Sequence, residues 1–402
     1  MKIEKIILIS LPVIAAIILL LLTDVGLSLF DERQSAVHQQ NNAEAEQAHN
    51  EALEAGFDNY DYIYQEEFSA FKDKVQKQWG EFKSSSETEW VSYVDQGKVR
   101  RSVDYETGEI SVELLIKDGI SSQDTERILA KEVFTLMNTT EAGAFRADEV
   151  AQKVEARLPS DFRTIKRGLP SGKRIFSLDD LTSITFNASG FVKVSTKIGN
   201  LATNDVRQAK VLGSNIIRSS FTIKKSLLQK AARFATAVRI SSERQKIPTA
   251  LIYAIIESES SFNPMAKSHI PAYGLMQIVP RSAGQDATKH LYGKAKILAP
   301  SYLYSTDNNI NIGSAYLHVL YYKYLRKVKD PQSRIYCTIA AYNTGATNVA
   351  RAFIKKKHFN LAVKEINKMT SDEVYQALVN HLPFKETRNY VKKVSDRMEK
   401  YL

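Results

Sequence analysis

The chain has a single cysteine, Cys337, among its 402 residues. One cysteine forms neither an internal disulfide nor a structural zinc site, and the seven histidines form no cluster with the spacing of metal ligands. Because no cysteine stands near the N-terminus, a lipid-modified N-terminal cysteine is excluded. The sequence therefore predicts no metal and no cofactor, and it places Cys337 in the core of an apolar helix.

Long apolar runs are also scarce, and only one stands out. Residues 6–22 are broken by one serine and one proline, and Lys2 and Lys5 precede them. Seventeen residues lie between the length of a signal-peptide core and that of a full membrane span. Since no small-x-small cleavage site follows, residues 1–30 are predicted to be an uncleaved membrane anchor with its basic end in the cytoplasm. A cleaved secretory signal, which leaves a soluble periplasmic form, is the alternative.

Charge is unevenly distributed along the chain. Residues 1–60 hold three Lys or Arg against nine Asp or Glu, a net charge of −6. Because the whole chain has a formal net charge of +10, residues 61–402 carry a net charge of +16. The acidic stretch 31–60, rich in Gln, Asn, Ala and Glu, reads as a tether that is either disordered or a solvated helix. The basic remainder indicates an acidic partner. Nucleic acid is a poor candidate, because the chain is predicted to be exported and lacks nucleic-acid-binding motifs.

Residues 61–225 read as a small α+β domain. Phe68, Phe71, Val75 and Trp79 recur at helical spacing, which predicts a helix over 64–82. Alternating apolar runs then predict an antiparallel sheet with a turn at Gly108. The expected strands are 88–94, 98–105, 109–116, 184–186, 191–196 and 216–222, a helix is expected over 124–137, and residues 143–177 carry no pattern that assigns them.

Aromatic and basic residues coincide on the first strands of this domain. Trp90, Tyr93 and Tyr105, with Arg100 and Arg101, are either a face that stacks on sugars and pairs with carboxylates, or core aromatics beside a solvated basic strand. The residues alone leave both readings open.

Residues 226–402 read as an all-α domain. Helices are expected over 227–244, 310–324, 333–342 and 370–380 and from about 386, and residues 289–307 are expected to be a loop. Tyrosines are dense enough here to line a cleft, although several stand at helical spacing and fit a core equally well. The tyrosines concerned are Tyr302, Tyr304, Tyr316, Tyr321, Tyr322, Tyr336 and Tyr342.

Within that domain, one glutamate stands on an apolar helix face. Glu259 follows Ile255 at i+4 and Ile256 at i+3, so it falls inside the apolar stripe, whereas Glu257 points about 200° away. A carboxyl held against an apolar face loses hydration, which raises its pKa toward the range of a general acid. Glu257 is expected to be ionised and solvated. The alternative for Glu259 is a polar residue at a helix end, and Pro264 is expected to stop the helix at about Phe262.

The segment after Glu259 has a characteristic spacing. Ser268 follows Glu259 by nine residues and GLMQ ends eighteen residues after it, with Gly274 as the expected point of close backbone approach. With the motif ESSFNP around Glu259, NINIGSAYL from Asn309, AAYNTG from Ala340 and ETRNYV from Glu386, the domain resembles the catalytic domain of the lytic transglycosylases, which is similar in fold to goose-type lysozyme. Pro271 and Tyr273 depart from the small residues usual before GLMQ.

This resemblance implies a fold, an activity and a set of site residues. The expected enzyme cleaves the β-1,4 bond between N-acetylmuramic acid and N-acetylglucosamine in peptidoglycan without water, and it leaves 1,6-anhydromuramyl ends. Glu259 would be both acid and base. The residues that would bind the glycan are Ser268, Met276, Gln277, Tyr342, Asn343 and Tyr390, of which Tyr390 would lie close to Glu259. The strand order of the first domain resembles the N-terminal domain of the membrane-bound lytic murein transglycosylase C family.

Two other functions remain open at this stage. A hydrolytic muramidase needs a second carboxylate to activate water, such as Asp307 or Glu386. A non-catalytic peptidoglycan-binding protein of the envelope needs no acid at all, and the intact motif around Glu259 argues against it. The expected partners are peptidoglycan glycan strands and, through the N-terminal segment, a membrane. The expected location is the bacterial cell envelope, facing the periplasm.

Overall fold

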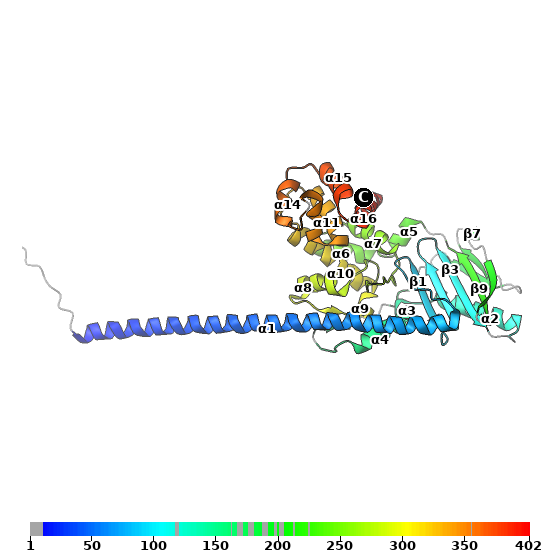
Figure 1. Cartoon of the computed structure of the whole chain (residues 1–402), viewed down its shortest axis with the longest axis horizontal. Coiled ribbons are helices and arrows are strands. Elements are labelled where there is room, and N and C mark those ends of the chain that lie inside the picture. Colours follow the sequence, from blue (N-terminus) through cyan, green and yellow to red (C-terminus); the bar gives the residue numbers. More distant parts are fainter. Residues whose placement is uncertain are drawn as a thin grey trace, which may run out of the picture. The chain divides into compact units, whose positions relative to one another are not determined.

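The computed structural model describes residues 11–116, 120–161, 163–166, 172–175, 181–186, 192–196, 199–200, 205–211, 214–223, 226–354 and 356–402. The chain divides into two compact units, Met1–Ala55 and Gly56–Leu402. Figure 1 shows the order of the elements. The second unit is mostly helical, and its described strands form a five-stranded antiparallel sheet, a three-stranded antiparallel sheet and a two-stranded parallel pair.

Helix α1 (Leu11–Trp79) runs through most of the predicted anchor and all of the tether. Residues 1–10 of that anchor lie outside the described residues. Within the part of the chain that the structure describes, no helix has the length and apolarity needed to cross a membrane. The tether is helical, which is one of the two expected forms. From Gly56 on, α1 belongs to the second unit, where Phe57 and Tyr60 are buried at helical spacing, so the last predicted tether residues pack into that unit.

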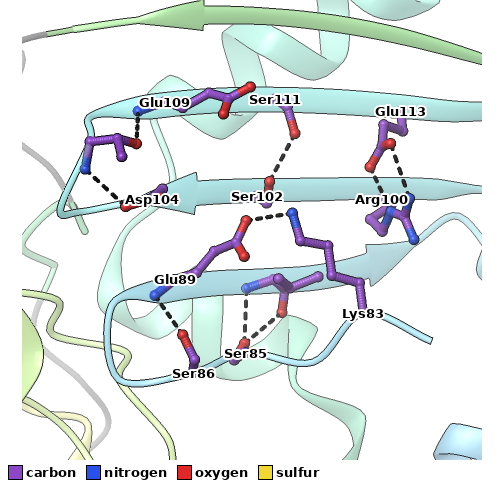
Figure 2. Close-up of polar contacts among 12 residues, drawn as sticks. Lys83, Ser85, Ser86, Glu89, Arg100, Ser102, Asp104, Glu109, Ser111 and Glu113 are labelled. Carbon is purple, nitrogen blue, oxygen red and sulfur yellow. Dashed lines mark hydrogen bonds and ion pairs between the residues drawn. The ribbon is translucent and has the colours of Figure 1, made fainter.

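The sheet has the strand order β1-β2-β3-β9-β8 and is antiparallel throughout. Its strands are β1 (Glu89–Val94), β2 (Val99–Asp104), β3 (Glu109–Ile116), β8 (Asp205–Val211) and β9 (Ser214–Thr222). The four strands β1, β2, β3 and β9 were predicted from alternation, whereas β8 was not. At the tight turn between β2 and β3, the Asp104 carboxylate accepts a hydrogen bond from the backbone N–H of Thr107 over 3.0 Å (Figure 2). It also accepts from the N–H of Glu106 over 2.8 Å.

The polar residues of β2 are buried and paired, which corrects the binding-face hypothesis. Arg100 is 4% exposed, donates to the Glu113 carboxylate over 2.6 Å (Figure 2), and lies over the Trp79 ring. Arg101 is buried and pairs with Glu132. Trp90 and Tyr105 are core residues, as the alternative reading held, but the basic strand is not solvated. Glu132 of α2 (Ser122–Met137) and Trp79 at the end of α1 cover its arginines, which the strand sequence does not reveal.

Further short elements complete this half of the unit, and three of them, α3, α4 and β4, lie in the stretch 143–177 that had no assignable pattern. These elements are α2 (Ser122–Met137), α3 (Glu141–Ala147), α4 (Glu149–Arg157), β4 (Thr164–Ile165), β5 (Leu181–Phe186), β6 (Val192–Thr196) and β7 (Gly199–Asn200). Strands β5, β6 and β7 form a separate three-stranded sheet, and β4 pairs in parallel with β10 (Ile297–Leu298). The β4–β10 pair joins the two halves of the second unit, and the predicted domain boundary at 225/226 stays a prediction.

The C-terminal half of the unit is helical (Figure 1). Its helices are α5 (Leu227–Ala232), α6 (Ala235–Gln245), α7 (Thr249–Ser260), α8 (Gln285–Tyr292), α9 (Pro300–Leu303), α10 (Thr306–His318), α11 (Pro331–Thr344), α12 (Ala346–Val349), α13 (Arg351–Ile354), α14 (Phe359–Ile366), α15 (Ser371–His381) and α16 (Lys385–Met398), with π-helical turns at Pro280–Gly284 and Val319–Tyr324 and a 3₁₀ turn at Glu399–Tyr401. The predicted helix 227–244 is broken before Phe234, whose buried ring stacks on Phe262 at 5.9 Å. The predicted loop 289–307 was partly wrong, since it contains β10 and α9 and its tyrosines Tyr302 and Tyr304 are buried.

Candidate active site

Helix α7 presents its acid as the helix ends. Leu251, Ile252, Ile255 and Ile256 are fully buried, and Glu259 lies in the last turn, partly exposed. Ser261 and Phe262 then adopt left-handed backbone conformations, with φ of 50° and 69°, so the helix stops slightly before the predicted position. Such angles are unfavourable for a bulky residue and persist where tertiary contacts hold them, here the stack of Phe262 on Phe234.

Burial raises the pKa of the Glu259 carboxyl to about 7, as its apolar setting predicts. The hydrogen bond from Tyr390 and the positive charge of Lys393 act in the opposite direction, and the negative charges of Glu87 and Glu386 add to the rise. At neutral pH the protonated and ionised forms are therefore both populated. A group of this kind can give a proton in one step and take one in the next.

Tyr390, on α16, brings a hydroxyl to this carboxyl. Its Oη atom donates a hydrogen bond to Oε1 of Glu259 over 2.5 Å. Tyr390 is buried, and burial together with the nearby Glu259 charge holds the pKa of its phenol well above the ordinary value. The hydroxyl therefore stays a donor and fixes one carboxyl oxygen, and none of the described residues forms a hydrogen bond to Oε2.

The loop before α8 is held by one amide side chain. Asn309, on α10, accepts from the N–H of Met276 over 2.8 Å and donates to the carbonyls of Tyr273 and Leu303 over 2.7 Å and 2.8 Å. Gly274 lies against this amide with φ of 72°, and a Cβ there would meet the Leu303 carbonyl oxygen at 2.7 Å. The predicted close approach at Gly274 is confirmed. Asn309 was part of a quoted motif, but no role was predicted for it.

Tyr342 and Met276 form the floor beneath this loop. The Tyr342 hydroxyl donates to the Met276 carbonyl over 2.7 Å, and burial raises the pKa of this phenol well above its usual range. The Met276 side chain is fully buried and packs on Gly313. The Met276 side chain therefore lies under the surface, whereas the family resemblance implied that it would bind the glycan.

Gln277 and Asn343 each carry a polar side-chain atom that forms no hydrogen bond with another of the described residues. Gln277 has φ of 46° and donates through Nε2 to the Gly274 carbonyl over 3.0 Å. Its Oε1 is buried and has no hydrogen-bond partner among the described residues. The Asn343 Oδ1 accepts from the Thr387 hydroxyl over 2.7 Å, which assigns Oδ1 as the acceptor of this amide. Nδ2 is then a donor, with no partner in the part of the chain that the structure describes. An acceptor and a donor of this kind suit hydroxyl and N-acetyl groups.

Ser268 closes a turn. Its hydroxyl donates to the Ile270 carbonyl and accepts from the N–H of Ala272. This is the turn role that a serine at this position commonly has, and no described contact joins its side chain to Glu259. The nearby departure Tyr273 is fully buried and accepts a hydrogen bond from Tyr60 of α1 over 2.9 Å, so α1 braces the loop.

The expected solvation of Glu257 was wrong. Its side chain is buried rather than solvated, and it forms an ion pair with Arg397 at 3.0 Å and accepts from the Tyr401 hydroxyl over 3.0 Å. The C-terminal residues pack over this face of α7, which helix periodicity does not reveal. Arg397 also donates to the Glu257 carbonyl, so α16 fixes the last turn of α7, which carries Glu259.

The two carboxylates considered as partners of the acid are both exposed. Asp307 is exposed and forms an ion pair with Lys173 at 2.6 Å. Glu386 is exposed and acts on Glu259 through its charge. Glu87, which sequence reasoning missed, acts in the same way from the loop before β1. Two backbone carbonyls hold this loop against the helical half. The Ser86 carbonyl accepts a hydrogen bond from the N–H of Lys267, and the Glu87 carbonyl accepts one from Nδ2 of Asn263, both over 3.3 Å.

Both halves of the second unit resemble known protein families. Residues 53–153 match the family described as "Membrane-bound lytic murein transglycosylase C, N-terminal domain", and residues 236–363 match "Transglycosylase SLT domain". The chain is 30% identical over 359 residues to the membrane-bound lytic murein transglycosylase C of Sodalis glossinidius, covering 88% of this chain and 93% of the relative. The protein of that description from Pectobacterium atrosepticum is 30% identical, with coverages of 82% and 88%. The 70-kDa soluble lytic transglycosylase of Escherichia coli is 28% identical over 42% of this chain and 24% of that chain, with a TM-score of 0.32.

Proposed function

The chain belongs to the membrane-bound lytic murein transglycosylase C family, and from this premise we propose that Glu259 is the single acid and base of its reaction with peptidoglycan. The observation that carries the proposal is the Glu259 carboxyl, whose pKa burial raises to about 7 and whose Oε1 is held by Tyr390. No metal or cofactor is needed for the steps that follow.

In the first step, protonated Glu259 gives its proton to the oxygen of the β-1,4 bond that follows N-acetylmuramic acid. The bond from C1 to that oxygen breaks, and N-acetylglucosamine leaves with a free hydroxyl. Positive charge develops on the muramyl C1 and ring oxygen. The new carboxylate of Glu259, which accepts from Tyr390, is stabilised as it forms, because a hydrogen bond to the charged form favours that form.

In the second step, the Glu259 carboxylate takes the proton from the C6 hydroxyl of the same muramyl residue. The C6 oxygen bonds to C1 and closes the 1,6-anhydro ring, and Glu259 returns to its protonated form. No water is consumed. A carboxyl with a pKa of about 7 suits both directions of proton transfer at neutral pH.

The remaining site residues would hold the glycan. Gln277, through its unpartnered Oε1, would accept from a sugar hydroxyl or N–H, and Asn343, through Nδ2, would donate to an N-acetyl or hydroxyl oxygen. Tyr342 would form the floor under the bound sugar, held by the Met276 carbonyl, and Ser268 would shape the rim through its turn.

Relatives in this family are described as membrane-bound, and we propose that this protein is bound to a membrane too. We place its catalytic domain on the periplasmic side of the cell envelope. The apolar stretch within residues 1–30 would anchor it, with the acidic part of α1 as spacer. A lysozyme-like fold of residues 226–402 is the arrangement expected for this family of catalytic domains.

A Glu259→Gln variant of the full chain tests the assignment. Solubilised peptidoglycan is digested by the parent, by Glu259→Gln and by Glu243→Gln, whose side chain is exposed on α6. We expect Glu259→Gln to lose at least about a thousandfold in kcat, in the range usual for removal of an acid–base group, while its melting temperature is kept. Glu243→Gln is expected to match the parent. Activity of Glu259→Gln close to that of the parent would remove Glu259 from the chemistry.

A hydrolytic muramidase is the second candidate. The observation that favours it is the charge of Glu87 and Glu386 near the acid, since a second carboxylate can activate water. Both side chains are exposed and well hydrated. They do not prevent the C6 hydroxyl from attacking C1 in place of water.

A further inference from the structure

Positive charge is concentrated at one end of the helical half. Residues 323–368 contain eleven Lys or Arg against two Asp or Glu. Both acids are engaged locally, because Asp330 caps α11 by accepting from Ser333 N over 2.6 Å and Glu365 pairs with Lys368 at 2.9 Å. The excess is therefore not neutralised within this part of the chain.

The cations come from segments that lie side by side. Lys327 Nζ donates to Asn360 of α14 over 2.9 Å, and the N–H of Lys329 donates to the Asn367 side chain over 2.9 Å, so the loop before α11 packs against α14. Lys356 and Lys357 stand just before α14 begins. We call the following six side chains the basic patch: Arg326, Lys327, Lys329, Lys356, Lys357 and Lys364.

All six side chains of the basic patch are exposed, and none forms an ion pair with another of the described residues. Clustered like charges repel one another and lower stability, so a face with only a structural role is normally mixed in sign. The surface where α1 meets α4 is mixed in this way, with Lys74 paired to Glu149 and Arg157 to Glu66. The basic patch differs from that surface, which indicates an acidic partner.

The position of the basic patch suits a partner that also occupies the active site. Helix α11 begins at Pro331, beside the patch, and carries Asn343 near its other end. At 1.5 Å of rise per residue, about 18 Å separates the two along the helix. Figure 1 shows α14 far from the sheet, at the end of the helical half. The patch thus lies outside the site but within reach of a polymer that extends beyond it.

We propose that the basic patch is an exosite that binds the carboxylates of peptide stems on polymeric peptidoglycan while the glycan occupies the site at Glu259. This proposal rests on the proposed function. Peptide stems carry carboxylates at repeated positions along a strand, so several weak contacts act together and raise the local concentration of substrate. A short soluble fragment that fills only the active site does not reach the patch.

Neutralising four of these lysines tests the proposal. The variant carries Lys329→Gln, Lys356→Gln, Lys357→Gln and Lys364→Gln in the full chain. The matched control carries the same change in charge at four exposed lysines elsewhere in the unit: Lys72→Gln, Lys77→Gln, Lys98→Gln and Lys131→Gln. Both are combined with Glu259→Gln for binding to insoluble peptidoglycan, which requires no turnover, and both are also assayed with Glu259 intact.

The patch variant is expected to bind insoluble peptidoglycan about tenfold more weakly than the control at low salt, because four exposed ion pairs together contribute about that factor. The difference should vanish at high salt and on peptidoglycan whose stems have been removed. On a short tetrasaccharide-peptide, which contains one bond from N-acetylmuramic acid to N-acetylglucosamine, kcat and KM should equal those of the control. Equal binding of patch variant and control to peptidoglycan would overturn the proposal, and so would a difference that survives removal of the stems. Binding to phosphatidylglycerol vesicles is measured in parallel, and a loss of binding by the patch variant that is seen only with the vesicles would also overturn it. Failure of the parent to cleave the short fragment would count against the proposed function alone, since the binding assay is independent of it.

Discussion

The Tyr390 hydroxyl lies 2.5 Å from Oε1 of Glu259, across 131 residues of sequence. This contact opposes the effect of burial on the same carboxyl. Burial favours the neutral acid, whereas the hydrogen bond favours the carboxylate, and the pKa of Glu259 settles at about 7. The balance makes the pH dependence of the enzyme adjustable by single substitutions around the acid.

Tyr390→Phe should shift the pH profile and slow the reaction. Removing the hydrogen bond takes away stabilisation of the carboxylate, so the pKa of Glu259 rises further and the acid stays protonated to higher pH. The falling limb of kcat/KM above neutral pH should therefore move to higher pH. We expect kcat at the optimum to fall by about tenfold to a hundredfold, the worth of a hydrogen bond to a charged group. A limb that stays in place or moves to lower pH would contradict the role given to Tyr390.

Lys393→Met and Glu87→Gln should shift the same limb in opposite directions. The Lys393 charge lowers the pKa of Glu259, so its loss moves the limb to higher pH. The Glu87 charge raises that pKa, so its loss lets Glu259 ionise at lower pH and moves the limb to lower pH. Profiles of kcat/KM at low ionic strength measure both shifts, and added salt should reduce them. Shifts of the same sign would show that charge at these positions does not act on Glu259.

Glu257→Gln should lower stability and leave the chemistry intact. The Glu257 carboxylate is buried against Arg397, and its loss leaves a cation without its partner, at a cost of about 3 kcal/mol in the free energy of unfolding. Urea unfolding at pH 7 measures this cost, with Glu243→Gln as a control whose exposed ion pair is worth under about 1 kcal/mol. Specific activity of the folded variant should remain within about threefold of the parent, since Glu257 faces away from the site. A loss comparable to that of Glu259→Gln would mean that Glu257 takes part in the reaction.

Gly274→Ala should damage the loop more than Gly293→Ala. Both glycines have positive φ, 72° and 76°, so both substitutions carry the same backbone strain. Only at Gly274 does the added Cβ meet backbone, the Leu303 carbonyl, and the Asn309 amide, whereas Gly293 faces open space. We expect KM to rise severalfold for Gly274→Ala, as Gln277 shifts with the loop, and little change for Gly293→Ala. Equal kinetic effects would show that the contact with Asn309 does not place the loop.

Local pattern was enough for several elements of the fold. The alternation in 88–94, 98–105 and 109–116 predicted β1, β2 and β3, because side chains of a strand alternate between a buried and an exposed face. The apolar stripe before Glu259 predicted both α7 and the raised pKa of its acid. These features depend on neighbours within a few residues, which a sequence displays directly.

Features that depend on distant neighbours were missed or were found only through resemblance. Glu87 reaches the acid because its loop packs against Asn263 and Lys267, about 180 residues away, and no local pattern marks it. The burial of Glu257 under Arg397 has the same origin. Tyr390 was expected near Glu259 only because its motif resembles that of the transglycosylases, since its spacing alone indicates helix packing.

The direct measurement is mass spectrometry of peptidoglycan digested by the full-length protein in water enriched in oxygen-18. If Glu259 acts alone and the C6 hydroxyl attacks C1, the new muramyl ends are 1,6-anhydro and contain no heavy oxygen, and Glu259→Gln produces none of them. Reducing muramyl ends that carry oxygen-18 as the main product would contradict this account, because water would then be the nucleophile and Glu87 or Glu386 would have to activate it.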